Sequence, residues 1–156
     1  MDCFTDEPIE RAMLARKANK LEPLKQWYCD SCGEVINQAK DGHLQWIKDN
    51  VYEKSFVIVH NKKDCLYDEG VYRERKETVA DLPLSDYVGI DGLLLLLDHM
   101  ETKKTKDNKE LVEIIARIQV PYYEEGRRSM DEEDFGDSIE RRARILKSIT
   151  NISKRN

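Results

Sequence analysis

The apolar residues between positions 25 and 67 follow the spacing of β-strands. Two short runs, LQWI at 44–47 and FVIV at 56–59, are rich in aromatic and β-branched side chains, which favour strands. Because side chains alternate along a strand, His60 shares a face with the first and third residues of the second run. Asp41-Gly42 is a turn signal typical of hairpins. This part of the chain is therefore predicted to form an antiparallel β module of three or four strands.

From Ser85 onward the apolar residues recur with the period of helices. Ser85 can cap a short turn that ends at Gly89, and Asp91 can cap a longer helix. The apolar run at 93–97, together with Met100, covers a wide sector of that helix. A helix with so wide an apolar sector is expected at the centre of a helical core.

Two further helices are predicted after it. The first starts at Asp107 or Asn108 and ends at Pro121, because proline interrupts a helix. The second starts at Asp137, with Glu140 completing a capping box. This last helix has an apolar face and a basic face, so it packs inside the domain, pairs with a second copy, or lies on nucleic acid. The apolar positions of the two helices are Leu111, Ile114, Ile115 and Ile118, and Ile139, Ala143, Leu146, Ile149 and Ile152.

These patterns divide the chain into four predicted segments. They are an N-terminal helical arm at 1–24, a β module at 25–67, a charged connection at 68–84 and a helical subdomain at 85–156. Strand spacing in one half and helical spacing in the other predict an α+β fold, a small antiparallel β module followed by a helical subdomain.

The composition narrows the classes of function. The 156 residues include 26 Lys and Arg against 31 Asp and Glu, which gives a net charge of −5. Such a surface creates no overall field that would attract nucleic acid or anionic lipid. The N-terminus MDCFTDEPIE lacks the apolar region of a signal peptide, and the run at 93–97 is too short to span a bilayer. We expect a protein of the reducing cytoplasm.

Three of the four cysteines and one histidine are spaced as metal ligands. Cys29 and Cys32 are two residues apart and are followed by a glycine, while His60 and Cys65 are four residues apart. Zinc favours four thiolate and imidazole ligands in a tetrahedral arrangement. The glycine can adopt a left-handed conformation that lets backbone N–H groups reach the sulfurs. We predict a zinc site made of Cys29, Cys32, His60 and Cys65, with His43 as the alternative nitrogen ligand.

The predicted site is structural. Four protein ligands leave no open position for a water molecule, so the metal would not be catalytic. Its binding free energy would instead contribute to folding and would offset the thin core of a short β segment. Cys3 lies outside this set and is expected to be a free thiol. The alternative interpretation is a group of buried thiols beside an ordinary polar histidine.

The stretch CDSCG at 29–33 resembles the knuckle of zinc ribbons and treble-clef fingers. Members of those families usually have a second ligand pair two to four residues apart, and the pair His60 and Cys65 mixes the two ligand types. Two longer stretches, LPLSDYVGIDGLLLLLDHM and IIARIQVPYYEEGRR, are similar to small bacterial or phage-type proteins that join a zinc-knuckle sheet to a helical tail. This resemblance implies a two-part architecture and no particular activity.

Three functions are compatible with the sequence. The first is a non-enzymatic, zinc-stabilised interaction or regulatory protein that binds a protein partner, because no nucleophile–base or paired-carboxylate motif is evident. The second is a nucleic-acid-binding regulator of the zinc-ribbon type, supported by the basic C-terminal helix. The third is a metal-dependent nuclease or hydrolase, for which His60-Asn61 would need a second histidine at a matching spacing. Only His43 and His99 are left for that role.

Two other clusters have a functional and a plain interpretation. Tyr122, Tyr123 and Glu124 with Arg127 and Arg128 combine aromatic and charged side chains, which suits either a protein interface or a polar rim over a helical core. The acidic run at 131–134 lacks the spacing and the glycine of a calcium loop, so we expect a solvated loop.

Overall fold

The computed structural model describes residues 21–102, 104–128, 140 and 143–147. Most of the predicted N-terminal arm lies outside this range, as do Cys3 and the acidic run at 131–134. The predicted start of the last helix at Asp137 also lies outside it, whereas residues 140 and 143–147 are helical.

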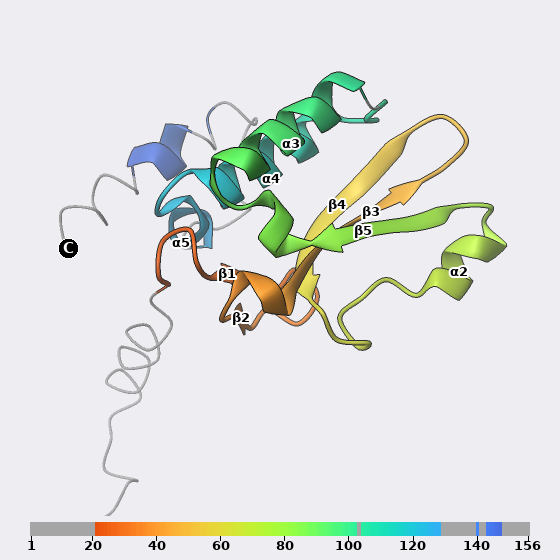
Figure 1. The fold of residues 1–156 in the computed structure, drawn as a ribbon, viewed down its shortest axis with the longest axis horizontal. Helices are drawn as coiled ribbons and strands as arrows, with labels where there is room; N and C mark the ends of the chain where they lie inside the picture. Colours follow the sequence, from red (N-terminus) through yellow and green to blue (C-terminus); the bar gives the residue numbers. More distant parts are fainter. Residues whose placement is uncertain (1–20, 103, 129–139, 141–142, 148–156) are drawn as a thin grey trace, which may run out of the picture.

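The strands form two antiparallel sheets (Figure 1). In the smaller sheet β1 (Trp27–Tyr28) pairs with β2 (Val35–Ile36). In the larger sheet β3 (Gly42–Lys48) lies between β4 (Glu53–His60) and β5 (Thr78–Pro83). The two apolar runs of the sequence lie in β3 and β4, as predicted. The sheets together with the helices confirm the α+β fold class.

The hairpin turn predicted at Asp41-Gly42 is not formed, and the observed hairpin joins β3 to β4. The chain reverses at residues 49–52, where the N–H of Asp49 donates to the carbonyl of Tyr52 and the Asp49 carboxylate accepts from two N–H groups. Asp41 instead ends a short 3-10 helix, η2 (Ala39–Asp41), and Gly42 begins β3. A Cβ on Gly42 would lie 3.0 Å from Leu84, so this glycine permits close packing.

The predicted charged connection contains regular structure. Asp68 caps the helix α2 (Glu69–Glu74) by accepting hydrogen bonds from two N–H groups of its first turn. Strand β5 follows and pairs with β3 from Lys48↔Thr78 to His43↔Pro83. The sequence TVADLP gives a weak strand signal because β5 is an edge strand and is largely exposed.

The longer helices lie side by side on one side of the larger sheet (Figure 1). The 3-10 helix η3 (Leu84–Tyr87) leads into α3 (Gly89–Thr102), which is followed by α4 (Asn108–Gln119) and the short α5 (Tyr123–Arg128). Asp107 caps α4 by accepting from the N–H of Lys109 at 2.9 Å, which confirms the predicted start of this helix.

Two other predicted caps are wrong. Ser85 lies inside η3, whose N-terminal residue makes no side-chain cap. Asp91 lies in the first turn of α3 rather than before it, because this helix already begins at Gly89. The carboxylate of Asp91 still suits the positive end of the helix dipole.

One core joins the sheets to the helices. Trp46 and Phe56 stack at 5.7 Å between ring centroids, and the His99 ring of α3 meets both edge-on. This core contains side chains from both the predicted β module and the predicted helical subdomain. Its buried members are Trp27, Cys29, Ile36, Leu44, Trp46, Phe56, Ile58, Val59, Cys65, Leu84, Tyr87, Leu96, Leu111, Ile114 and Ile118.

Helix α3 is not central in the core, in contrast to the prediction. Its buried residues are Gly92, Leu96 and His99. Several other leucines of the apolar run face outward, and Leu94 is 61% exposed. The core buries only one face of α3. The apolar sector of this helix is wider than that face, so some of its apolar side chains are left exposed.

Candidate metal centre

The four predicted ligands lie at one end of the larger sheet. Cys29 follows β1, Cys32 lies in the turn towards β2, His60 is the last residue of β4, and Cys65 lies in the turn after it. One ligand atom from each residue, the three Sγ atoms and an imidazole nitrogen, can be chosen so that all four lie within 4.8 Å of one another. The structure therefore brings together a Cys3His group that could hold a metal ion.

The knuckle (residues 29–33) has the geometry expected of a metal-binding turn. The N–H of Gly33 donates to the carbonyl of Cys29 at 2.9 Å, and Gly33 has a φ of +78°, the left-handed region predicted for it. The Cys29 sulfur accepts from the N–H groups of Ser31, Cys32 and His60 at 3.4–3.5 Å. Such bonds stabilise the thiolate form, which is the form that binds metals.

Each ring nitrogen of His60 lies close to a different kind of atom, a carbonyl oxygen at Nε2 and cysteine sulfurs at Nδ1. Nε2 lies 3.1 Å from the carbonyl oxygen of Val35, which can only accept a hydrogen bond, so Nε2 carries the proton. Nδ1 then has a free lone pair, and it lies 3.3 Å from the Cys32 sulfur and 3.9 Å from the Cys65 sulfur. A carbonyl that fixes the tautomer of a histidine ligand is a common feature of metal sites.

The electrostatics of the thiols differ across the group. Burial raises the pKa of Cys29, but the N–H groups that donate to its sulfur, Cys32 first, outweigh burial and lower that pKa to about 6. Burial, together with the neighbouring Cys29 and Cys32 sulfurs, raises the pKa of Cys65 to about 11. If all three sulfurs bound a divalent cation as thiolates, the charge of the ion would offset the repulsion between them.

The knuckle is tied to β4 and to the helices by Asp30. The N–H of Asp30 donates to the carbonyl of Ile58, and the N–H of Ile58 donates back to the Asp30 carboxylate, both at 2.8 Å. The same carboxylate accepts from Arg117 of α4 at 2.8 Å. Arg117 also pairs with Glu124 of α5 at 2.8 Å and donates to the carbonyl of Tyr28. The sequence analysis missed this network, because Asp30 and Arg117 are 87 residues apart.

The aromatic and charged cluster around Tyr123 makes contacts inside the molecule. Tyr123 is buried and donates its hydroxyl to Glu113 at 2.7 Å. Arg127 bonds to Glu113 and Glu124. The guanidinium of Arg128 lies 4.3 Å from the centre of the Tyr28 ring. These contacts hold α5 against the knuckle side of the molecule.

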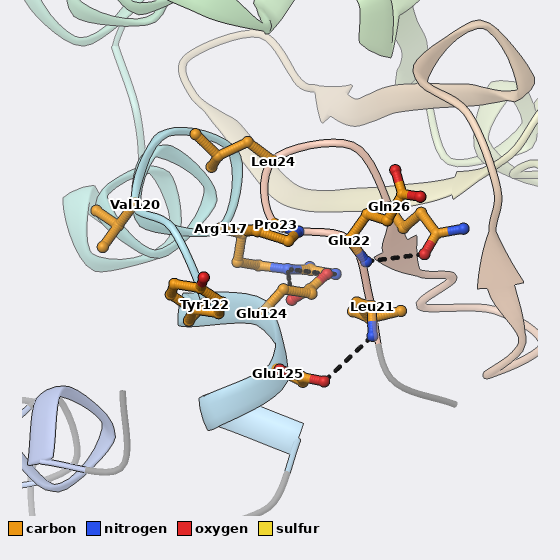
Figure 2. Close-up of a pocket in the computed structure, with 10 residues that line it drawn as sticks. All are labelled: Leu21, Glu22, Pro23, Leu24, Gln26, Arg117, Val120, Tyr122, Glu124 and Glu125. Carbon is orange, nitrogen blue, oxygen red and sulfur yellow. Dashed lines mark hydrogen bonds and ion pairs between the residues drawn. The ribbon is translucent and has the colours of Figure 1, made fainter. Parts of the chain in front are cut away.

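A small hollow lies beside this network (Figure 2). One wall is formed by residues 21–24 and Gln26, and the other by Arg117, Val120, Tyr122, Glu124 and Glu125. In its lining, Arg117 bonds to Glu124, and one oxygen of the Glu125 carboxylate accepts from the N–H of Leu21 at 3.1 Å while the other has no hydrogen-bond partner among the described residues. None of the four cluster residues lines it. The hollow is therefore separate from the Cys3His group.

The other two histidines are not part of the Cys3His group. The Nδ1 atom of His43, the predicted alternative ligand, lies 3.9 Å from the carboxylate of Asp81 on the adjacent strand β5. His99 lies in the core, with Nε2 2.6 Å from a Glu53 oxygen. The arrangement of histidines around one metal that a His-Asn-His nuclease requires is therefore not formed by the described residues.

Comparison with known proteins adds no family. No family model matches the chain, and neither a curated protein nor a solved structure is significantly similar to it. The likeness to zinc ribbons and treble-clef fingers thus rests on the knuckle and on the Cys3His group. Among the described residues, no helix has both the length and the apolar character needed to cross a membrane.

Proposed function

We propose that this protein is a non-enzymatic, zinc-stabilised module that binds another protein. The ligand set supports zinc, because three thiolates and one imidazole are a common structural zinc environment. Four protein ligands fill a tetrahedral shell, so the ion would hold the knuckle to the end of β4 and would not activate water. The described cysteines form no disulfide, which supports a reducing cytoplasm as the compartment.

The proposal of protein binding is supported mainly by the exposed apolar residues on the outer side of α3. Ile90 is 71% exposed, Leu94 61% and Leu97 45%. Ten large hydrophobic residues of the described chain are exposed, and α3 contributes four of them, Leu95 being the fourth. A group of apolar side chains on one helix is costly to leave in water, and such surfaces commonly mark interaction sites.

The zinc part is tested by metal analysis of the purified protein. Wild-type protein is expected to contain about one zinc ion per chain. His60→Ala removes a ligand and should lose the ion and lower the melting temperature. His43→Gln is the matched control, because His43 lies outside the group, and it should keep the ion. Wild-type protein without metal, or unchanged melting after chelation, would contradict the proposal.

The binding part is tested by affinity capture from an extract of the native host. Leu94→Gln removes an exposed apolar side chain from α3, and Val51→Gln removes one of similar exposure, 56%, from the β3–β4 turn. A protein captured by the wild type and by Val51→Gln but lost with Leu94→Gln would support the proposal. Equal capture by all three would show that α3 is not the binding site.

Nucleic-acid binding stays an alternative prediction. Binding to mixed DNA or RNA at low salt, lost steeply as salt is added, would support it. The described arginines nearest the knuckle do not favour it, since Arg117 and Arg127 are paired with carboxylates and Arg128 stacks on Tyr28.

A further inference from the structure

Helix α3 has two apolar faces. At about 3.6 residues per turn, Ile90, Leu94 and Leu97 fall on one stripe, about two turns long. The buried residues Gly92, Leu96 and His99 lie on the opposite side of the same helix. The inner face is covered by the core. The outer stripe is therefore an additional apolar surface on an element whose position is already fixed.

The carboxylates that α3 itself carries beside the outer stripe all have the same sign of charge. Asp91 and Asp98 are seven residues apart, so they lie along one edge of it, and Glu101 lies at its C-terminal end. All three are exposed. Helix α3 contains no lysine or arginine, and the next described base, Lys104, follows the end of the helix. The outer face of α3 is thus an apolar stripe with an acidic border.

We infer that the outer face of α3 binds an amphipathic helix of a partner protein whose apolar stripe is flanked by lysine or arginine. This inference rests on the proposed protein-binding function and specifies its partner. A second helix can pack its apolar stripe on Ile90, Leu94 and Leu97, as in helix-in-groove recognition. Basic residues at its edge would face Asp91 and Asp98, and this complementarity gives specificity and a faster association.

The same charges argue against other occupants. In an antiparallel pair of two α3 helices related by a two-fold axis, each edge meets the same edge of the other copy. Asp91 and Asp98 would then face acids, which is unfavourable. A membrane carrying anionic lipid would also be repelled by the acidic border. An amphipathic helix with basic edges can cover the apolar stripe and pair with its acidic border.

The test uses three synthetic peptides of roughly 18 residues, long enough for several helical turns. The first is an amphipathic helix of leucine and lysine, the second has glutamate in place of lysine, and the third is a scrambled leucine–lysine sequence. Binding to the full-length protein is measured by fluorescence anisotropy. We expect the amphipathic lysine peptide to bind about tenfold or more tightly than either of the others.

Substitutions in the protein test whether the lysine peptide binds at the outer face of α3. Leu94→Gln should weaken binding of the lysine peptide about tenfold, whereas Val51→Gln should leave it unchanged. Asp98→Asn with Glu101→Gln should weaken it about threefold or more at low salt, whereas the exposed Glu74→Gln of α2 should have no effect. The exposed positions chosen are expected to leave folding intact, and thermal melts of each variant check this.

Several results would overturn the inference. They are equal binding of the lysine and glutamate peptides, binding unaffected by Leu94→Gln, no peptide binding, and binding to phosphatidylcholine–phosphatidylserine vesicles that Leu94→Gln abolishes. A concentration-dependent dimer lost with Leu94→Gln would also overturn it and would assign the face to a second copy of the chain. If peptides fail but capture from the extract still depends on Leu94, the proposed function stands and only the partner chemistry is wrong.

Discussion

At the scale of single residues, Arg117 connects the knuckle to the helices. Its side chain is 3% exposed and pairs with both Asp30 and Glu124. Burial alone would lower the pKa of Arg117, but these two carboxylates raise it further than burial lowers it. A buried cation is tolerated here because each side of the guanidinium has a partner.

Glu124→Gln should therefore destabilise the protein strongly. The change leaves the buried Arg117 with Asp30 as its remaining carboxylate, and breaking a buried pair in this way costs about 3 kcal/mol. The free energy of unfolding from denaturant titration measures the effect. Glu101→Gln, on the exposed side of α3, is the control and should change it by less than about 0.5 kcal/mol. Equal stability of the two variants would refute the role given to this pair.

Asp49 gives the hairpin a pH dependence. The N–H groups of Tyr52 and Val51 hold the pKa of Asp49 below its usual value. A lowered pKa in the folded state means that the contribution is present above about pH 4 and is lost as the pH falls further. Asp49→Asn keeps an acceptor oxygen but no charge, so its loss of stability relative to the wild type should be larger at pH 6 than at pH 3. Urea titrations at both pH values test this, and a pH-independent difference would count against it.

At the scale of elements, α3 depends on a close approach at its first turn. A Cβ on Gly92 would overlap the carbonyl group of Tyr87 and lie 2.6 Å from its Cα. These are backbone atoms, which cannot rotate away as a side chain can. The glycine therefore allows η3 and α3 to fit together and places the two faces of the helix.

Gly92→Ala should destabilise the protein by about 2 kcal/mol or more, because the backbone must shift to accept the methyl group. Thermal and denaturant unfolding measure the change. Gly70→Ala in α2 is the matched control, since its Cβ would meet only a side-chain oxygen at 3.2 Å and alanine favours helices. A Gly92→Ala protein as stable as this control would show that the contact is not limiting.

At the scale of the whole molecule, the Cys3His group and the helices share one hydrophobic core. Cys29 and Cys65 are members of the same buried cluster as Leu96 and Leu111. The division of the chain into a β module and a helical subdomain stays a prediction, but the core continues across the boundary at residue 85.

If the Cys3His group holds the proposed zinc ion, removing that ion with a chelator should therefore weaken the sheet and the helices together. Thermal unfolding in the presence of a chelator is expected to occur at a lower temperature and in one transition. Circular dichroism reports the helices, and tryptophan fluorescence reports Trp27 and Trp46 of the strands. Two separate transitions would show instead that the β module unfolds independently of the helices.

Local patterns were sufficient for part of this protein. The apolar runs of β3 and β4, the capped start of α4 and the two short ligand pairs each depend on residues close together in the sequence, so their spacing alone predicted them. The left-handed conformation of Gly33 follows from the same local argument.

The tertiary structure decided what depends on distant residues. It placed His60 rather than His43 at the cysteines, made an edge strand of residues 78–83, and joined Asp30 to Arg117. It also determined which side of α3 is buried. The sequence of α3 is apolar over a sector wider than one neighbour can cover, so its spacing predicts a helix but not which face is left outside. That choice depends on where the sheet, η3 and α4 lie, and they are set by the fold as a whole.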